Sequence, residues 1–184
     1  MNTTSLLVDI LIIGIQVLVW ISAFLSSFLF SVKEIMNLSE KSPTVFIFIV
    51  IAISYTLGIV FDYIIANFFN KFKSKEENET YRKGLVISIL NYDKDVQKFL
   101  DSQYARLRIA RATVFNLPLI TVSICTYILS NHIQIETPIC IAIFLVLSIG
   151  IILTIVAYYG WKSRNKVYWG YIKETLKLID KKKN

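Results

Sequence analysis

The sequence predicts an all-α integral membrane protein with four transmembrane helices, a helical cytoplasmic loop and an amphipathic C-terminal helix. Two features of its composition lead to this fold class. Only 18% of the 184 residues are charged and 55% are apolar, whereas a soluble domain is about 25% charged. The charges also leave four long stretches bare, and 18 of the 20 basic residues lie in just two of the segments outside those stretches.

The four apolar stretches define the predicted spans, which cover about 10–32, 44–69, 112–130 and 138–161. Each is long enough, because a helix needs about 20 residues to cross a bilayer core of about 30 Å. Strands are excluded because an open sheet edge in lipid leaves backbone groups unpaired. The segments are apolar on all sides, whereas the helices of a soluble bundle show a polar stripe. The whole chain, 1–184, is therefore predicted to form one membrane domain.

The first span is expected to be retained as a helix rather than cleaved as a signal peptide. The residues before it, Met1–Asp9, contain no Lys or Arg, and the apolar run is longer than a signal peptide requires. Asp9, Gln16 and Ser27 share one face of this helix. We interpret that face first as a packing surface and second as the lining of a polar lumen.

The second span contains Asp62, the sharpest single feature of the sequence. A charged residue inside a span costs roughly 2.5–3.5 kcal/mol on insertion scales, so it indicates function. Asp62 lies about 10 Å from the end of its helix near Phe69, and it shares a small, polar face with Ser54 and Gly58. Three interpretations remain open for it: an ion pair with Arg108 or Arg111, a residue lining an ion or proton path, or a neutral, hydrogen-bonded carboxyl.

The loop at 70–111 is predicted to be helical. Ser74 and Glu77 form a possible capping box, and neither Pro nor Gly interrupts 93–116, so the second loop helix is expected to continue unbroken into the third span. That helix would bring three arginines to the lipid headgroups, where guanidinium groups bind phosphates readily: Arg106, Arg108 and Arg111.

The tail at 162–184 is predicted to form an amphipathic, basic helix. Tyr168, Ile172 and Ile179 lie on one side of it, away from its lysines. Such a helix can lie on the membrane surface or pack on the loop helices, and packing is favoured because the loop helices also have apolar faces. Lys162 and Arg164, at its start, join the three loop arginines as predicted contacts for lipid or another anion.

The distribution of basic residues predicts the orientation of the chain. Ten lie in the loop at 70–111 and eight in the tail from Lys162. The positive-inside rule places both segments in the cytoplasm, and with four spans the N-terminus is cytoplasmic too. We therefore predict a multi-pass protein of the cell membrane. Its basic charge indicates contact with anionic lipid headgroups and not with nucleic acid.

No catalytic or metal-binding set can be assembled from the sequence. His132 is the single histidine, and one histidine near Glu136 does not make a metal site. Asp9 and Asp62 are each the only carboxylate of their span, so no paired carboxylates are evident. The chain is therefore predicted not to be an enzyme and to need no cofactor.

Two classes of function remain. The first is an oligomeric pore, channel or membrane-permeabilising effector gated from the cytoplasmic side, formed as a homo-oligomer. Its candidate polar and gating residues lie within or beside the spans: Asp62, Arg108, Arg111, Gln16 and Asp9. The alternative is a non-conducting accessory or scaffold subunit whose loop and tail helices dock a cytosolic or membrane partner. In the first class the cytoplasmic trigger could be a protein or an anionic ligand.

Overall fold

The computed structural model contains four long helices. It describes residues 3–28, 42–71, 94–131 and 137–183, and no strand occurs within these ranges. The helices are, in chain order, α1 (Thr3–Phe28), α3 (Pro43–Asn70), α5 (Lys94–Asn131) and α6 (Thr137–Lys183). Pro43 stands in the first turn of α3, a position that Pro favours because the first amides of a helix have no partner within it.

All four helices are long and apolar enough to cross a membrane, which indicates an integral multi-pass membrane protein. The candidate spans are Leu6–Ser27, Pro43–Phe69, Lys98–Asn131 and Pro138–Thr175. The first two resemble the predicted spans in length. The last two are longer than a bilayer requires, because their helices continue beyond the apolar segment.

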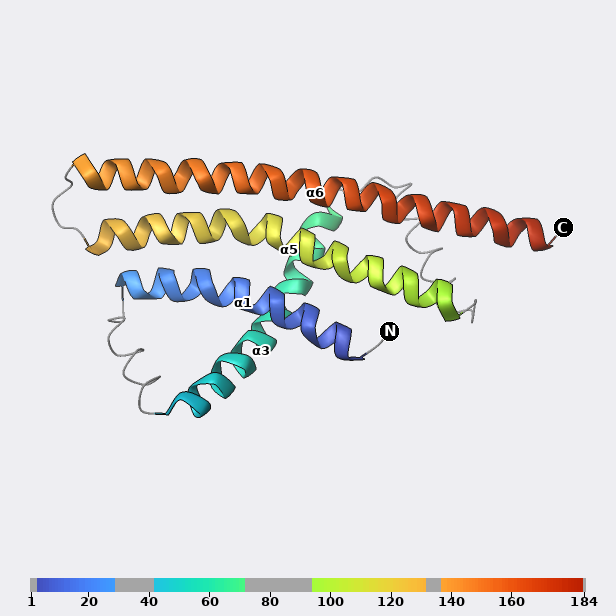
Figure 1. The fold of residues 1–184 in the computed structure, drawn as a ribbon, viewed down its shortest axis with the longest axis horizontal. Helices are drawn as coiled ribbons and strands as arrows, with labels where there is room; N and C mark the ends of the chain where they lie inside the picture. The colour runs from blue at the N-terminus through green and yellow to red at the C-terminus, as the bar shows by residue number, and fades with distance from the viewer. Residues whose placement is uncertain (1–2, 29–41, 72–93, 132–136, 184) are drawn as a thin grey trace.

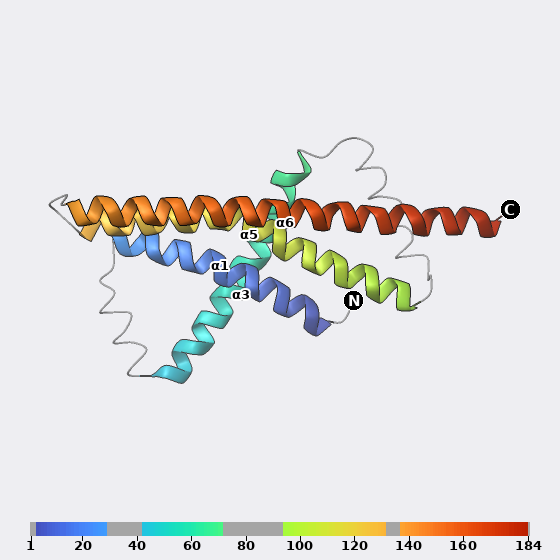
Figure 2. The ribbon, with the colours of Figure 1, turned by 45° about the horizontal axis from the view of Figure 1, so that its top comes forward.

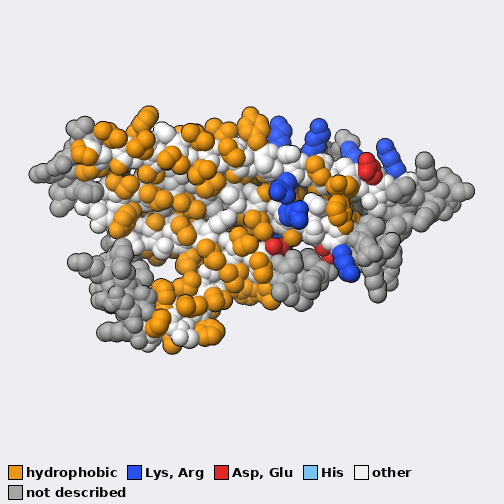
Figure 3. All heavy atoms as spheres, viewed as in Figure 1, with side chains coloured by type: hydrophobic (Ala, Val, Ile, Leu, Met, Phe, Trp, Pro, Cys, Tyr) orange, Lys and Arg blue, Asp and Glu red, His pale blue; other side chains and the backbone are white. Residues whose placement is uncertain are grey.

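Three helices run roughly alongside one another and the fourth crosses them. Figure 1 shows α1, α5 and α6 in one layer, with α3 passing obliquely across them, and Figure 2 shows the same crossing from a second direction. The start of α1, the start of α5 and the end of α6 point to the same end of the molecule. We call this the charged end. In Figure 3, apolar side chains cover the visible face from the opposite end to about the middle, and Lys and Arg side chains lie beyond it.

The prediction of an unbroken helix leading into the third span is confirmed. The helix α5 runs from Lys94 to Asn131 and continues through Pro118. At about 1.5 Å per residue its 38 residues are about 57 Å long, nearly twice the thickness of the bilayer core. The predicted loop helix with the capping box at Ser74 falls at 72–93, outside the described residues.

The tail is helical, as predicted, and it is continuous with the helix of the fourth span. The helix α6 continues without a break through Gly160 and Gly170 to Lys183. Glycine inside a helix costs only about 1 kcal/mol relative to alanine, and packing of the following residues on α5 offsets that cost. The 47 residues of α6 are therefore one helix of about 70 Å.

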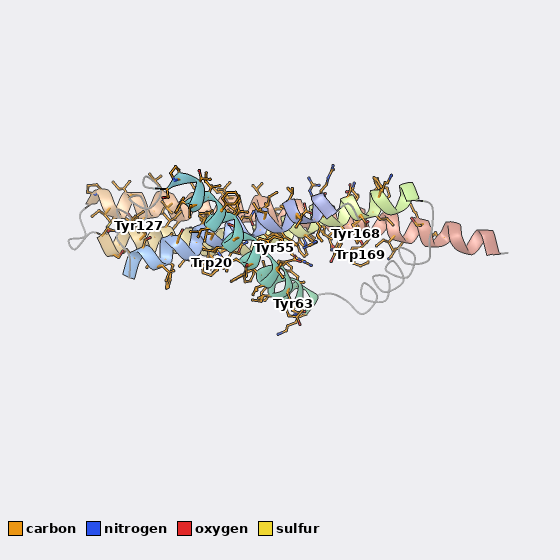
Figure 4. All side chains as sticks on the ribbon, turned by 90° about the horizontal axis from the view of Figure 1, so that it is seen from below. Trp20, Tyr55, Tyr63, Tyr127, Tyr168 and Trp169 are labelled. Carbon is orange, nitrogen blue, oxygen red and sulfur yellow. The ribbon has the colours of Figure 1, made fainter. Side chains whose placement is uncertain are left out.

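Beyond the apolar spans, α5 and α6 continue as an antiparallel pair, residues 94–107 with 162–183, which we call the extension. Its buried core consists of Leu100, Trp169 and Ile172, with Tyr168 packed against it. The Trp169 indole Nε1 donates a hydrogen bond to Asn165 Oδ1 over 2.9 Å. Figure 4 shows Tyr168 and Trp169 beside the first half of α5. The preference for packing the tail on the loop helix is thus confirmed over the described part of both.

A second core lies where α3 crosses the other helices. Ile13 of α1, Ile65 and Phe69 of α3 and Ala112 of α5 form it. Trp161 of α6 packs against it, with its ring centroid 4.8 Å from that of Phe69. All four helices therefore meet at one level, within two turns of Asp62, and this packing fixes the surroundings of the candidate site.

Candidate functional site

The candidate site is a buried cluster of charged side chains at the charged end of the bundle. Arg108 Nη2 donates to Asp62 Oδ2 over 2.8 Å, and Arg111 Nη2 donates to Asp62 Oδ1 over 3.3 Å. The two arginine side chains are only 8% and 7% exposed, and Asp62 is 21% exposed. One carboxylate therefore bridges two guanidinium groups between α3 and α5, which corresponds to the first of the three interpretations left open for Asp62.

Helix geometry explains why these three side chains meet. Arg108 and Arg111 are three residues apart, so they emerge on one face of α5. Asp62 follows Ser54 and Gly58 at intervals of four residues on one face of α3. Ser54 and Gly58 are buried against α1, so the face of α3 that carries Asp62 is the one turned into the bundle.

The crossing of α1 over α3 depends on two glycines. A Cβ atom added to Gly14 would collide with the backbone carbonyl of Ser54, and one added to Gly58 would collide with that of Ile10. Small residues allow helices in membranes to approach backbone to backbone. This close approach fixes the position of α3 along α1. It therefore also fixes the position of Asp62, one turn after Gly58.

Asp9 lies at the same end and adds a second carboxyl to the cluster. Its side chain is buried, with 7% of the residue exposed. Arg108 and Asp62 both act on it electrostatically. Its Oδ2 atom has no hydrogen-bond partner among the described residues. The sequence places Asp9 among the polar and gating candidates but predicts no partner for it, and its isolation as the single charge in α1 is the signal that could have pointed to a buried partner.

Gln16 joins α1 to α5 deeper in the span. Its Nε2 donates to Thr113 Oγ1 over 3.0 Å, and its Oε1 accepts from Asn116 Nδ2 over 3.2 Å. Thr113 donates in turn to the Ile109 carbonyl over 2.9 Å. Gln16 therefore faces the interior of the helix bundle, and both hydrogen bonds of its amide are made to α5 of the same chain.

Buried and half-buried polar side chains continue from the cluster into the span. Within the described residues, several of their atoms have no hydrogen-bond partner: Asp9 Oδ2, Trp20 Nε1, Ser54 Oγ, Asn116 Oδ1 and the Nε atoms of Arg108 and Arg111. We call the set Asp9, Gln16, Trp20, Ser54, Asp62, Arg108, Arg111, Thr113 and Asn116 the polar column. Its members come from α1, α3 and α5, and Figure 4 shows Trp20 and Tyr55 in the region where α1 and α3 cross. Each partnerless polar atom costs about 1–3 kcal/mol when it is buried from water.

The predicted lipid and anion contacts divide into two groups. Arg106, Lys162 and Arg164 are exposed. Arg108 and Arg111 point inward and are bonded to Asp62. The structure thus separates an exposed set of cations from a buried pair that is partly neutralised.

The described residues contain no group of three or more His, Cys, Asp or Glu side chains that could hold a metal ion. Comparisons with protein-family models, with curated proteins and with solved structures found no match.

The Gln16 hydrogen bonds lead to a prediction for stability. Replacing Gln16 and Asn116 by leucine, singly and together, is expected to give a coupling energy of about 0.6 kcal/mol and no more than about 1.7 kcal/mol, the range found for hydrogen bonds between helices in membranes. Reversible unfolding in mixed micelles measures it. The pair Thr126→Val and Gln16→Leu is the control, because Thr126 bonds only its own helix, and these two changes should add without coupling.

Proposed function

We propose that the protein conducts ions across the membrane as a homo-oligomeric pore or permeabilising effector, gated at its charged end. In this proposal the charged end faces the cytoplasm of a cell, because the loop at 70–111 and the tail carry almost all of the basic residues. The exposed cations of that end, Arg106, Lys162 and Arg164, contact anionic headgroups at the cytoplasmic surface. No catalytic step is part of the proposal.

The polar column is the observation that supports conduction. Ionisable and polar residues inside a span are costly, and they mark pathways for ions and protons. A protein that only anchors itself in lipid gains nothing from buried atoms without partners. Water is the group that satisfies such atoms in other proteins, and a chain of waters along the column is the medium through which an ion or proton moves.

The ion pair at Asp62 is the proposed gate. It connects α3 to α5, which touch each other much less than either touches α1. The pair therefore contributes a large share of what holds these two helices together at the charged end. Breaking or exchanging it lets α3 shift against α5 and changes access to the column, as charged constrictions do in channels.

Oligomerisation is proposed because a single chain leaves most of two spans uncovered. Only 11% of the most apolar window of α3 and 6% of that of α6 are buried within the chain. Large apolar side chains on α3, such as Phe48 at 69% exposed, face outward. In the proposal, neighbouring copies cover part of this surface and lipid covers the rest. Native mass spectrometry from detergent reports the number of copies.

Ion flux in liposomes tests the proposal. The native chain is expected to release a trapped ion, and Asn116→Leu, which replaces a polar group of the column by a larger apolar side chain, is expected to lower the rate. Asp62→Asn is expected to alter gating. Glu174→Gln is the matched control, because Glu174 is exposed on the extension, and its flux should equal that of the native chain.

Two results would contradict the proposal that the protein conducts ions. Folded native protein that passes no ion at any pH, voltage or lipid composition would contradict conduction. So would an Asn116→Leu protein that conducts as fast as the native chain.

A scaffold role is the second candidate, and the extension is the feature that favours it. Phe99, Val167 and Tyr171 are between 40% and 48% exposed there, on a helix pair already stabilised by its own core. A partner with an apolar helix face would fit such a surface. A monomeric native chain without flux, whose photo-crosslinker at Val167 labels another protein, would favour this candidate over the pore.

A further inference from the structure

We propose that the Asp9 carboxyl is a proton-binding site, and that the proton on it decides whether Arg108 pairs with Asp62 alone or is shared between the two carboxylates. The site itself stands on geometry, and only its role in gating rests on the proposed function. The ligand is the hydrogen ion, which binds and leaves without any other reactant.

Burial and an unused bonding position make Asp9 suited to this role. The residue is 7% exposed, and its Oδ2 has no partner among the described residues. An ionised carboxylate has two oxygens that both need donors. A neutral carboxyl depends less on hydrogen-bond donors, because without its charge most of the free-energy cost of leaving water is removed. Burial with an unpartnered oxygen is therefore less costly for a neutral carboxyl than for a carboxylate.

Among the described residues, the charged groups that act on Asp9 come from the two helices packed against α1. They are Asp62 of α3 and Arg108 of α5, and Arg111 of α5 joins them through its bond to Asp62. Asp9 is the only charged residue of α1 within Thr3–Phe28. With Asp9 ionised these four groups are neutral as a set, and with Asp9 protonated they carry one positive charge.

Asp9 is buried close to two opposite charges, those of Arg108 and Asp62. A positive neighbour favours an ionised carboxyl, whereas burial and a negative neighbour favour the neutral form. Movement of Arg108 toward or away from Asp9 therefore shifts the balance between the two forms.

Arg108 has a hydrogen-bond donor with which it can bind an ionised Asp9. Its Nη2 bonds Asp62, but its Nε is buried without a partner among the described residues. When Asp9 loses its proton, it becomes a second acceptor of full charge for this guanidinium. Sharing Arg108 between α1 and α3 weakens the Asp62 bridge, and Arg111, at 3.3 Å, remains as its longer half. If the Asp62 ion pair is the gate, deprotonation of Asp9 opens it by releasing α3 from α5.

Infrared spectroscopy of the full chain in liposomes tests the proton site directly. A protonated carboxylic acid in an apolar site has its own C=O absorption, separate from that of a carboxylate. We expect a band of this kind that disappears reversibly as the pH is raised, and we expect it to be missing from Asp9→Asn. Asp62→Asn should keep the band and shift the pH at which it disappears, since it removes a neighbouring negative charge.

Two results would overturn the site. One is a native spectrum with no titrating acid band. The other is a titrating band that persists unchanged in Asp9→Asn. Glu174→Gln is again the control, because loss of an exposed carboxyl on the extension should leave the band in place.

Pulsed electron paramagnetic resonance tests the exchange of partners. Spin labels at Tyr63→Cys on α3 and Val122→Cys on α5 use exposed positions, in a background where Cys125 and Cys140 are serine. The distance distribution is expected to broaden and shift as the acid band disappears, and to stay at its low-pH form in Asp9→Asn at every pH. An identical pH response in native and Asp9→Asn proteins would overturn the exchange.

The two proposals fail separately. A titrating Asp9 band and a label response without ion flux would remove the conduction proposal and leave the proton site. Flux without any Asp9 titration would do the reverse.

Discussion

Asp62→Ala is expected to destabilise the folded protein by about 3–5 kcal/mol, the cost of removing one partner from a buried ion pair. The reason is the charge left behind. Arg108 and Arg111 are only 8% and 7% exposed, so neither guanidinium can recover its hydration after Asp62 is removed. Reversible unfolding by denaturing detergent in mixed micelles measures the change.

Apolar replacement of the whole cluster provides the control. Asp62→Leu with Arg108→Met and Arg111→Met removes all three charges at once. Such replacements of buried ion pairs are often neutral or stabilising, so the triple variant should recover most of the stability that Asp62→Ala loses. Glu174→Ala, at an exposed position on α6, should change it by less than about 0.5 kcal/mol. An Asp62→Ala protein as stable as the native chain would show that the pair is not buried in the folded protein.

Gly58→Leu is expected to destabilise the protein by about 3 kcal/mol, at the upper end of the range for overpacking. A side chain at this position meets the backbone carbonyl of Ile10, which cannot rotate away as a side chain does. The two helices must separate, and α3 then carries Asp62 away from its arginines. Unfolding in mixed micelles should show the loss of stability. Labels at Tyr63→Cys and Val122→Cys should show the displacement of α3.

Gly160→Ala and Gly170→Ala are matched controls of opposite sign. Both glycines lie inside α6, and a Cβ at either would meet no atom within 4 Å. Alanine there should stabilise the helix by about 0.5–1 kcal/mol, because glycine loses more conformational freedom on folding. If Gly58→Leu and Gly160→Ala gave the same result, the contact between α1 and α3 at Gly58 would be disproved.

The parts of the fold that follow from local chemistry could be predicted from the sequence. Four apolar stretches give four helices, because a bilayer demands internal backbone hydrogen bonds over a known length. The unbroken course of α5 into the third span follows from the absence of Pro and Gly over 93–116. The partners of Asp62 could be predicted as well, since few cations lie at its depth.

Features that depend on packing between distant segments could not be predicted. The continuation of α6 through Gly160 and Gly170 is one such feature, because it is accompanied by the packing of Trp169 and Ile172 on Leu100. The closeness of Asp9 to Asp62 depends on the crossing of α1 and α3, and nothing in the sequence states which glycine meets which helix. That the charged and polar residues gate a path stays a prediction, since their positions alone do not measure flow.

The continuity of α5 has a mechanical consequence. Between Lys94 and Arg111 every residue belongs to one helix without proline, so this part behaves as a stiff rod with one end in the extension and the other in the charge cluster. Pro118 stands two turns beyond Arg111. Because proline has no backbone N–H to donate, α5 is expected to bend most easily at this position. A displacement of the extension is therefore expected to move Arg108 and Arg111 with it. Bending of α5 is expected beyond these arginines, at Pro118.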